Sequence, residues 1–258
     1  MNDAEEPLDG GNSNPDVVRV GDTVRRVAGR WTPAVHQLLD YLNERSYPAP
    51  RPLGFDDSGR EILSFIPGRC VHPDALELIA EEEGLTRVGR LIADYHHAQQ
   101  GFVPSDDAIW RDEGRDPSGS TEVLAHNDLA PWNLVAGPSG WVFIDWDLAA
   151  PGRRMWDLAW ALHSFVGLWP DSPLDDAMLA RHIAAFCDGA QLARSEIPKL
   201  LEVVVERTID HAALLRRRAA EGDQHFVRLV AEGHAAAWEG GARHVEANRP
   251  VWCALLRE

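Results

Sequence analysis

Lysine is nearly absent from this chain. Lys199 is the only lysine among 258 residues, so arginine carries almost all of the positive charge. The 25 basic residues face 41 acidic ones, and the formal net charge is -16. No basic patch with interleaved aromatic residues is present, so we expect no nucleic-acid partner. A negative charge of this size mainly keeps a protein soluble.

Cysteine is scarce, and long apolar runs are missing. The three cysteines, Cys70, Cys187 and Cys253, are widely spaced and form no Cys-x-x-Cys pair, which argues against a disulfide framework and a zinc site. No apolar run approaches the roughly 18 residues of a membrane helix. The polar residues 1–14 also lack the apolar core of a signal peptide. We therefore expect a cytoplasmic protein without a membrane partner, and the sequence leaves its oligomeric state open.

A dense group of polar residues lies between positions 126 and 145. His126-Asn127-Asp128 precedes Asn133 at the Asp-to-Asn spacing of the protein-kinase catalytic loop, and Asp145 follows. Transfer of a γ-phosphoryl group needs a carboxylate that orients the attacking hydroxyl, and Mg²⁺ held by oxygen ligands. Asp128, Asn133 and Asp145 can supply these groups, with Asp128 as the candidate base.

The spacing of Asn133 and Asp145 predicts a β-hairpin. Two apolar runs, 134–136 and 141–144, flank the turn-forming residues 137–140. Counted outward from Ser139, Asn133 and Asp145 are equally distant, so we expect them to face each other across the strands. An amide oxygen beside a carboxylate suits Mg²⁺. The alternative is a surface hairpin with polar residues at its open end, but the ordered combination favours the metal site.

These segments resemble the aminoglycoside phosphotransferase and choline kinase family, which comprises small-molecule kinases with a protein-kinase-like fold. Family members typically carry a His-Gly-Asp-x-x-x-x-Asn loop, an Ile-Asp-Trp/Phe-Asp/Glu segment and an Asp-Leu-Ala helix start. The matching segments here are 126–133, 144–147 and 157–159. The resemblance implies that Asp128 is the catalytic base, that Asn133 and Asp145 bind the metal, and that Asp157 braces the catalytic loop. Asp147, placed on the same strand face as Asp145, is open to a second metal contact or a structural role.

The resemblance extends to the segment that links the lobes. Residues 64–68 read Ser-Phe-Ile-Pro-Gly and are similar to the family's linker. The resemblance implies that their backbone groups contact the purine of ATP or GTP. The predicted purine contacts are Ser64, Phe65 and Ile66.

The N-terminal region departs from the kinase pattern of a Gly-rich loop, a strand lysine and a helix glutamate. Residues 17–20 and 23–27 predict a hairpin around Gly21-Asp22. Because no lysine is available, arginine must substitute for it, or nothing does. Arg26 is the preferred phosphate contact and Arg25 the second choice, against the alternative of two surface arginines. The predicted phosphate loop before the hairpin consists of Gly10, Gly11, Asn12 and Ser13.

The helix predicted over residues 32–42 begins with Thr-Pro and carries apolar residues at helical spacing. Its first three turns contain no glutamate, so the usual Lys-Glu pair is missing on both sides.

Two tryptophans farther along, Trp156 and Trp160, are four residues apart on a predicted helix, where core packing is the expected role. The histidines in helical stretches, including His96, show no metal-ligand pattern, so structural or surface roles are expected for them.

The remaining pattern predicts an α+β, two-lobed architecture, and the family resemblance implies that its fold is protein-kinase-like. Residues 1–68 form a small β-rich nucleotide-binding lobe with its linker, and residues 1–9 are expected to be disordered. Residues 69–258 form a large helical lobe with the catalytic loop and the substrate site. Apolar spacing and Gly or Pro breaks place helices over 73–99, with a break near Gly84, and over 157–168, 174–187, 195–221 and 223–244.

We therefore expect a Mg²⁺-dependent phosphotransferase that moves the γ-phosphoryl group of ATP or GTP to a hydroxyl of a small molecule, such as an aminoglycoside-type antibiotic. One alternative is a metabolic kinase that acts on an amino alcohol or a sugar. The other is a pseudokinase-like protein that binds a nucleotide or ligand without turnover. The missing Lys-Glu pair motivates the second alternative, whereas the complete set of Asp128, Asn133 and Asp145 argues against it.

Overall fold

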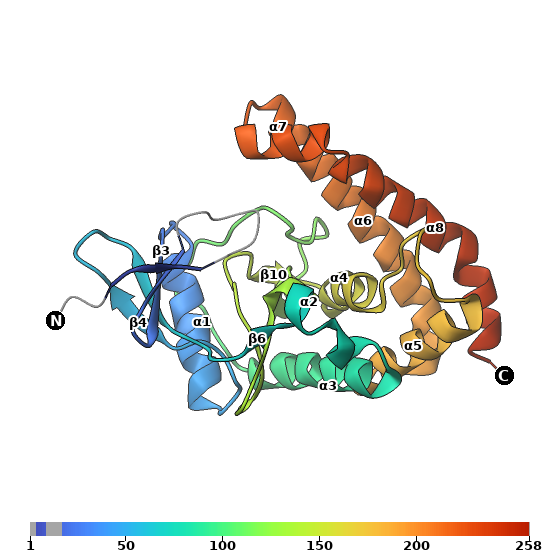
Figure 1. The fold of residues 1–258 in the computed structure, drawn as a ribbon, viewed down its shortest axis with the longest axis horizontal. Coiled ribbons are helices and arrows are strands. Elements are labelled where there is room, and N and C mark those ends of the chain that lie inside the picture. Colours follow the sequence, from blue (N-terminus) through green and yellow to red (C-terminus); the bar gives the residue numbers. More distant parts are fainter. Residues whose placement is uncertain (1–3, 9–16, 258) are drawn as a thin grey trace.

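The computed structural model describes residues 4–8 and 17–257. A small lobe built on a β-sheet lies beside a larger helical lobe (Figure 1). This arrangement confirms the predicted α+β fold with two lobes. The boundary at residue 68 stays a prediction. The predicted phosphate loop of Gly10, Gly11, Asn12 and Ser13 lies outside the described residues.

The small lobe contains a five-stranded antiparallel sheet in the order β1-β2-β3-β5-β4. Its strands are β1 (Glu6–Pro7), β2 (Val18–Val20), β3 (Thr23–Arg26), β4 (Pro52–Phe55) and β5 (Glu61–Ser64). The predicted hairpin around Gly21 is confirmed by the pairing of β2 with β3. The register between β3 and β5 places Arg26 opposite Glu61, so these two side chains share one face of the sheet.

One helix, α1 (Thr32–Glu44), belongs to the small lobe and confirms the helix predicted over 32–42. Proline in its first turn has a fixed backbone angle suited to a helix start. The predicted apolar face is buried through Val35, Leu38, Leu39 and Leu42. These residues belong to a hydrophobic core that continues into the helical lobe as far as Trp252, so the two lobes share one core.

Two further sheets lie in the helical lobe. The three-stranded sheet comprises β6 (Arg69–Cys70), β8 (Leu134–Gly137) and β9 (Gly140–Phe143), in the order β6-β8-β9. The two-stranded sheet pairs β7 (Val123–Ala125) with β10 (Ala150–Gly152). Since β7 leads directly into residues 126–133, it fixes the start of the candidate catalytic loop.

The predicted register of the β8–β9 hairpin is wrong by one residue. Leu134 lies opposite Phe143 and Gly137 opposite Gly140, so residues 138 and 139 alone form the turn. Two-residue loops are favoured in hairpins because their twist matches that of the strands. Asn133 therefore lies beside Ile144, and the N–H of Ile144 donates to the carbonyl oxygen of Asn133 at 2.9 Å. Asp145 lies beyond the end of β9. For the same reason Asp145 and Asp147 do not share a strand face.

Helices make up most of the larger lobe. The long helices α6 and α8 run alongside each other, and α7 lies at one end of this pair (Figure 1). The helices of the lobe are α2 (Val71–Asp74), η1 (Leu76–Ile79), α3 (Glu82–Ala98), η2 (Pro131–Asn133), α4 (Arg154–Val166), α5 (Asp176–Gly189), η3 (Arg194–Glu196), α6 (Ile197–Ala220), α7 (Gln224–Ala231) and α8 (His234–Leu255).

Several predicted helix boundaries in this lobe are wrong. The break expected near Gly84 is one of them, because Gly84 lies inside α3. The single helix expected over 223–244 is divided at Gly233, whose φ of 89° is left-handed and interrupts the helix between α7 and α8. Helix α8 then continues through Pro250 to Leu255. Helix α4 begins at Arg154, earlier than expected, so Asp157 lies in its first turn.

The prediction that residues 1–9 are disordered is also wrong for Glu6 and Pro7. Glu6 and Pro7 form β1 and pair with β2, with Glu6 opposite Arg19. A two-residue edge strand has no periodicity that a sequence pattern could reveal. Cys70, Cys187 and Cys253 are free. Among the described helices, none combines the length and the apolar character needed to cross a membrane.

Candidate active site

Asp128 lies in the loop between β7 and the β8–β9 hairpin. Its Oδ1 accepts a 3.0 Å hydrogen bond from the indole N–H of Trp160, and its Oδ2 accepts one of 2.8 Å from Nδ2 of Asn133. The same Nδ2 donates to the carbonyl oxygen of Asp128 at 3.0 Å. These contacts hold the carboxylate in one orientation and leave the amide oxygen of Asn133 as the atom that can ligate a cation.

The environment of Asp128 changes its acidity. Burial raises the pKa of Asp128 to about 6, and the negative charge of Asp145 acts in the same direction. Hydrogen bonds from Trp132, Asn133 and Trp160 stabilise the charged form and oppose this rise in pKa. A carboxylate whose pKa lies near the operating pH accepts a proton more effectively than an ordinary surface aspartate. The site therefore suits Asp128 to general-base chemistry.

The backbone of the loop is anchored next to Asp128. Asn127 has a left-handed φ of 65°, which asparagine tolerates better than most residues. The carboxylate of Asp157 accepts hydrogen bonds from the N–H groups of His126 at 3.1 Å and Asn127 at 2.9 Å. From the other side, Nη2 of Arg207 donates to the carbonyl oxygen of Asn127 at 2.9 Å. The backbone N–H and the backbone carbonyl oxygen of Asn127 are thus both held in place.

Asp157 also contacts the helix behind the loop. Nε2 of His96, on α3, lies 2.9 Å from its Oδ2. Burial alone would raise the pKa of Asp157, but the hydrogen bond and charge of His96 outweigh it and hold the pKa below the usual value. A fully buried carboxylate with three partners fits the bracing role that the sequence implied.

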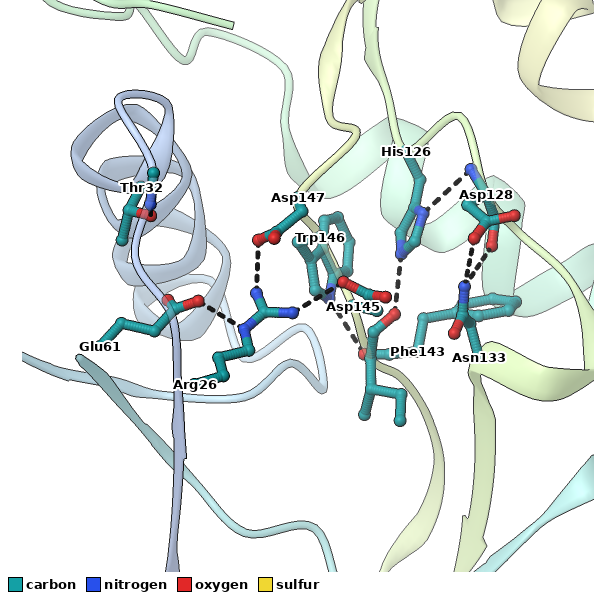
Figure 2. A network of polar contacts seen from close by, with 12 residues as sticks. Arg26, Thr32, Glu61, His126, Asp128, Asn133, Phe143, Asp145, Trp146 and Asp147 are labelled. Atoms are coloured by element: carbon teal, nitrogen blue, oxygen red, sulfur yellow. Dashed lines mark hydrogen bonds and ion pairs between the residues drawn. The ribbon is translucent and has the colours of Figure 1, made fainter. Parts of the chain in front are cut away.

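His126 connects the candidate catalytic loop to the segment that carries Asp145. Its Nδ1 accepts a 3.3 Å hydrogen bond from the N–H of Asp128, so Nε2 carries the proton and donates to the carbonyl oxygen of Ile144 at 3.2 Å. Burial lowers the pKa of His126. The neutral ring thereby holds the two chain segments in a fixed relation (Figure 2).

Arg26 reaches this site from the small lobe and lies among three carboxylates (Figure 2). Its Nη1 donates to Oδ1 of Asp145 at 2.7 Å, and its Nη2 donates to Oδ1 of Asp147 at 2.5 Å. Its Nε donates to Oε1 of Glu61 on the neighbouring strand. Arg26 is buried, so this ion-pair cluster ties the sheet of the small lobe to the segment after β9.

The electrostatics of this cluster are dominated by burial and by Arg26. Burial would raise the pKa of Asp145, but the guanidinium outweighs it and holds the pKa below the usual value. Asp145 has a left-handed φ of 59° and a side chain that is 41% exposed. Burial raises the pKa of Asp147, and Arg26 only partly offsets this rise. Three carboxylates around one guanidinium retain an excess of negative charge when ionised.

The side-chain oxygens of Asn133 and Asp145 suit a hard divalent cation. Among the described residues, no group of three or more His, Cys, Asp or Glu side chains is arranged to hold a metal ion. Asn133 and Asp145 instead offer one amide oxygen and one carboxylate. Mg²⁺ is typically held by one or two carboxylates together with substrate phosphates and water, so a sparse protein ligand set is what a nucleotide-bound ion requires.

The predicted purine contacts lie at the end of β5. The N–H of Ser64 donates to the carbonyl oxygen of Arg51, and the N–H of Phe65 donates to that of Asp22, both at 2.9 Å. Two of the three backbone N–H groups in the segment from Ser64 to Ile66 are therefore used within the protein. Arg25, the second choice for a phosphate contact, points away from the cluster and lies 4.0 Å from Asp56.

Several contributors to the site were missed by sequence reasoning. Glu61 stands in an alternating strand pattern with Leu63, but its partner Arg26 could be found only from the strand register. Trp160 was assigned to core packing, and it is buried, yet its N–H also contacts Asp128. Three further residues contribute through their partners. His36 contacts Glu61, His96 contacts Asp157, and Arg207 donates to the backbone of Asn127.

Comparison with known proteins places this site in a family. Residues 106–197, which include Asp128, Asn133 and Asp145, match the model of the phosphotransferase enzyme family. The trifolitoxin immunity protein of Rhizobium leguminosarum bv. trifolii is 32% identical over an alignment of 223 positions, which covers 81% of this chain and 83% of that protein. The chain belongs to the phosphotransferase enzyme family. The resemblance inferred from the sequence is thereby confirmed.

Solved structures support the same fold for this family member. The amicoumacin kinase hAmiN, in complex with AMP-PNP, Ca²⁺ and Ami, aligns with a TM-score of 0.62 at 11% identity and covers 89% of this chain and 88% of its own. A choline/ethanolamine kinase family protein from Mesorhizobium loti aligns with a TM-score of 0.59 at 15% identity, over 94% and 92% of the two chains. At these identities the similarity shows a shared kinase-like fold.

Proposed function

We propose that this phosphotransferase family member moves the γ-phosphoryl group of ATP or GTP to a hydroxyl of a small molecule, with Mg²⁺ bound between protein and phosphates. The observation that carries the proposal is the convergence of Asp128, Asn133, Asp145 and Arg26 at one place where the lobes meet. These side chains come from different elements and provide a base, oxygen ligands and a cation, which are the groups required for phosphoryl transfer.

Asp128 is the proposed catalytic base. Its raised pKa of about 6 still leaves it mostly ionised near neutral pH, where it can accept the proton of the attacking hydroxyl. Trp160 and Asn133 keep both carboxylate oxygens oriented during the reaction. This positioning is a large part of what a kinase contributes, because the transferred phosphoryl group needs little covalent assistance.

Asn133 and Asp145 are the proposed Mg²⁺ ligands, and the ion would neutralise charge on the nucleotide phosphates. Arg26 is the proposed phosphate contact, through N–H groups of its guanidinium that the three carboxylates do not use. The loop of Gly10, Gly11, Asn12 and Ser13 is the second proposed phosphate contact. The linker residues Ser64, Phe65 and Ile66 stay the predicted purine contacts.

The name of the 32% identical relative, a trifolitoxin immunity protein, supports a toxin or antibiotic as the acceptor. An aminoglycoside-type antibiotic and a metabolic amino alcohol or sugar remain the acceptors to compare. The non-catalytic alternative was motivated by the missing Lys-Glu pair, and the Arg26–Glu61 pair weakens that motive. A cytoplasmic location and the lack of a nucleic-acid partner stay predictions.

Thermal stabilisation by nucleotide tests the proposed site without knowledge of the acceptor. At a nucleotide concentration of about 100 times Kd, ATP or GTP with Mg²⁺ should raise the Tm of the native chain by about 5 °C. Asp145→Asn should remove most of this increase, and so should omission of Mg²⁺. Asp57→Asn, at an exposed position in the turn between β4 and β5, is the matched control and should respond like the native chain. Equal stabilisation of Asp145→Asn and the native chain would refute the metal assignment.

A further inference from the structure

Glu61 and Arg26 form a buried ion pair across two neighbouring strands. The register sets Arg26 of β3 opposite Glu61 of β5, and the Nε group of Arg26 donates to Oε1 of Glu61. Arg26 is 6% exposed and Glu61 is 1% exposed. An ion pair this deeply buried is a weak source of stability, because removing both charges from water offsets most of their attraction. Its presence calls for a role other than stabilisation.

From this geometry we infer that Glu61 is the positioning residue for Arg26 and takes the place of the missing helix glutamate. The inference rests on the proposed function, because Arg26 is taken to contact nucleotide phosphates. In protein kinases a glutamate on a helix holds the strand lysine. Here the acidic partner comes from a strand of the same sheet, so the pair is set by strand register.

The helix still takes part, through His36 on α1. Nε2 of His36 lies 3.0 Å from Oε2 of Glu61, while Oε1 binds Arg26. Both oxygens of the buried carboxylate are thereby satisfied. The ring of His36 also stacks on Phe55 of β4 at a centroid distance of 5.3 Å. The connection therefore runs from helix histidine to strand glutamate to strand arginine, and α1 is coupled to Arg26 through Glu61.

This arrangement explains why the position holds arginine in a chain that is almost free of lysine. With Nε held by Glu61, the planar guanidinium directs Nη1 to Asp145 at 2.7 Å and Nη2 to Asp147 at 2.5 Å. Lysine has a single nitrogen and cannot present three separate donors in one plane. Arg26→Lys keeps the charge but cannot keep these contacts, so it should behave more like Arg26→Ala than like the native chain.

A double-mutant cycle on nucleotide affinity tests the inference. The probe is ATP with Mg²⁺, and Kd is measured for the native chain, Arg26→Ala, Glu61→Gln and the double variant. Glu61→Gln should raise Kd by about tenfold, because a neutral amide oxygen holds the guanidinium of Arg26 less firmly than a carboxylate does. Combined with Arg26→Ala it should add little, because both changes disable one unit. Asp57→Asn serves as the unaffected control.

A purely structural role for Glu61 would lower Tm and leave the two effects on Kd additive, and that result would overturn the inference. If Glu61→Gln does not fold, His36 provides an independent route. His36→Gln can still donate to Glu61 and should keep the native Kd, whereas His36→Phe should raise it. Equal Kd values for these two variants would also overturn the inference. Failure of the native chain to bind nucleotide would instead refute the proposed function itself.

Discussion

The indole N–H of Trp160 donates a 3.0 Å hydrogen bond to Oδ1 of Asp128. Trp160 is 3% exposed and stacks on Trp238, with a centroid distance of 4.7 Å and an interplanar angle of 20°. A residue of the helical-lobe core is thus also a direct partner of the candidate base. The packing of α4 against α6 and α8 therefore affects the charge state of Asp128.

Trp160→Phe should shift the pH dependence of turnover. The lost N–H stabilises the charged form of Asp128, so its removal raises the pKa of this carboxyl above about 6. The acidic limb of the rate profile should move to higher pH, and the rate at pH 7 should fall. Trp238→Phe removes a similar volume from the same cluster without touching Asp128, and it serves as the control. Identical pH profiles for the two variants would contradict the proposed contact.

Asp128 should reduce stability at neutral pH. Its pKa is about 6 in the folded chain and about 3.9 when unfolded, so the folded state binds more protons between these values. The free energy of unfolding therefore falls as pH rises through this window, and the full penalty is present above it. Asp128→Asn should stabilise the fold by about 1–2 kcal/mol at pH 8, after allowance for partial exposure, and by little at pH 4. Urea unfolding at the two pH values measures this difference, and destabilisation at pH 8 would contradict it.

Arg207→Met should lower turnover while changing the stability of the fold only slightly. Arg207 is 1% exposed, and its guanidinium lies 4.8 Å from the ring centroids of both Trp156 and Trp160. Its Nε and Nη1 find no hydrogen-bond partner among the described residues. Because an incompletely paired buried charge can be replaced by an apolar chain at little cost, stability should change by less than about 2 kcal/mol. Loss of the contact to Asn127 should nevertheless lower kcat, and native kcat in a folded Arg207→Met variant would refute the anchoring role.

Asp157→Asn should destabilise the chain by about 2–4 kcal/mol at pH 7, because it weakens the contacts to His96 and to two backbone N–H groups. The pKa of Asp157 is below its unfolded value, so its contribution is present above about pH 4 and is lost as pH falls through the folded pKa. Denaturant unfolding from pH 7 to pH 3 should show the native chain and the variant converging. A constant difference over this range would argue against an ionised Asp157.

The sequence predicted the parts of this site that depend on local spacing. Asp128 and Asn133 lie within one short loop, and the hairpin around Gly21 is local, so their identification needed no tertiary information. The β8–β9 register failed because the turn residues 137–140 permit two pairings that differ by one residue. The break at Gly233 was missed because glycine also occurs within helices, as Gly240 does in α8.

The contacts that join distant segments could not be predicted. Arg26 and Asp145 are 119 residues apart in the sequence, and Asp128 and Trp160 are 32 apart. Apolar periodicity assigned Trp160 to a buried face correctly, but it does not specify which polar group a buried indole N–H will contact. The same holds for Glu61, since only the pairing of β3 with β5 brings it opposite Arg26.

The most direct test of the central claim is the release of ADP from Mg²⁺-ATP by the native chain and by Asp128→Ala, with a panel of antibiotics, amino alcohols and sugars as acceptors. The account predicts acceptor-dependent turnover by the native chain and a decrease of at least about 100-fold in Asp128→Ala, while Kd for the nucleotide remains within about threefold of the native value. Undiminished turnover by Asp128→Ala would contradict the assignment of Asp128 as the base.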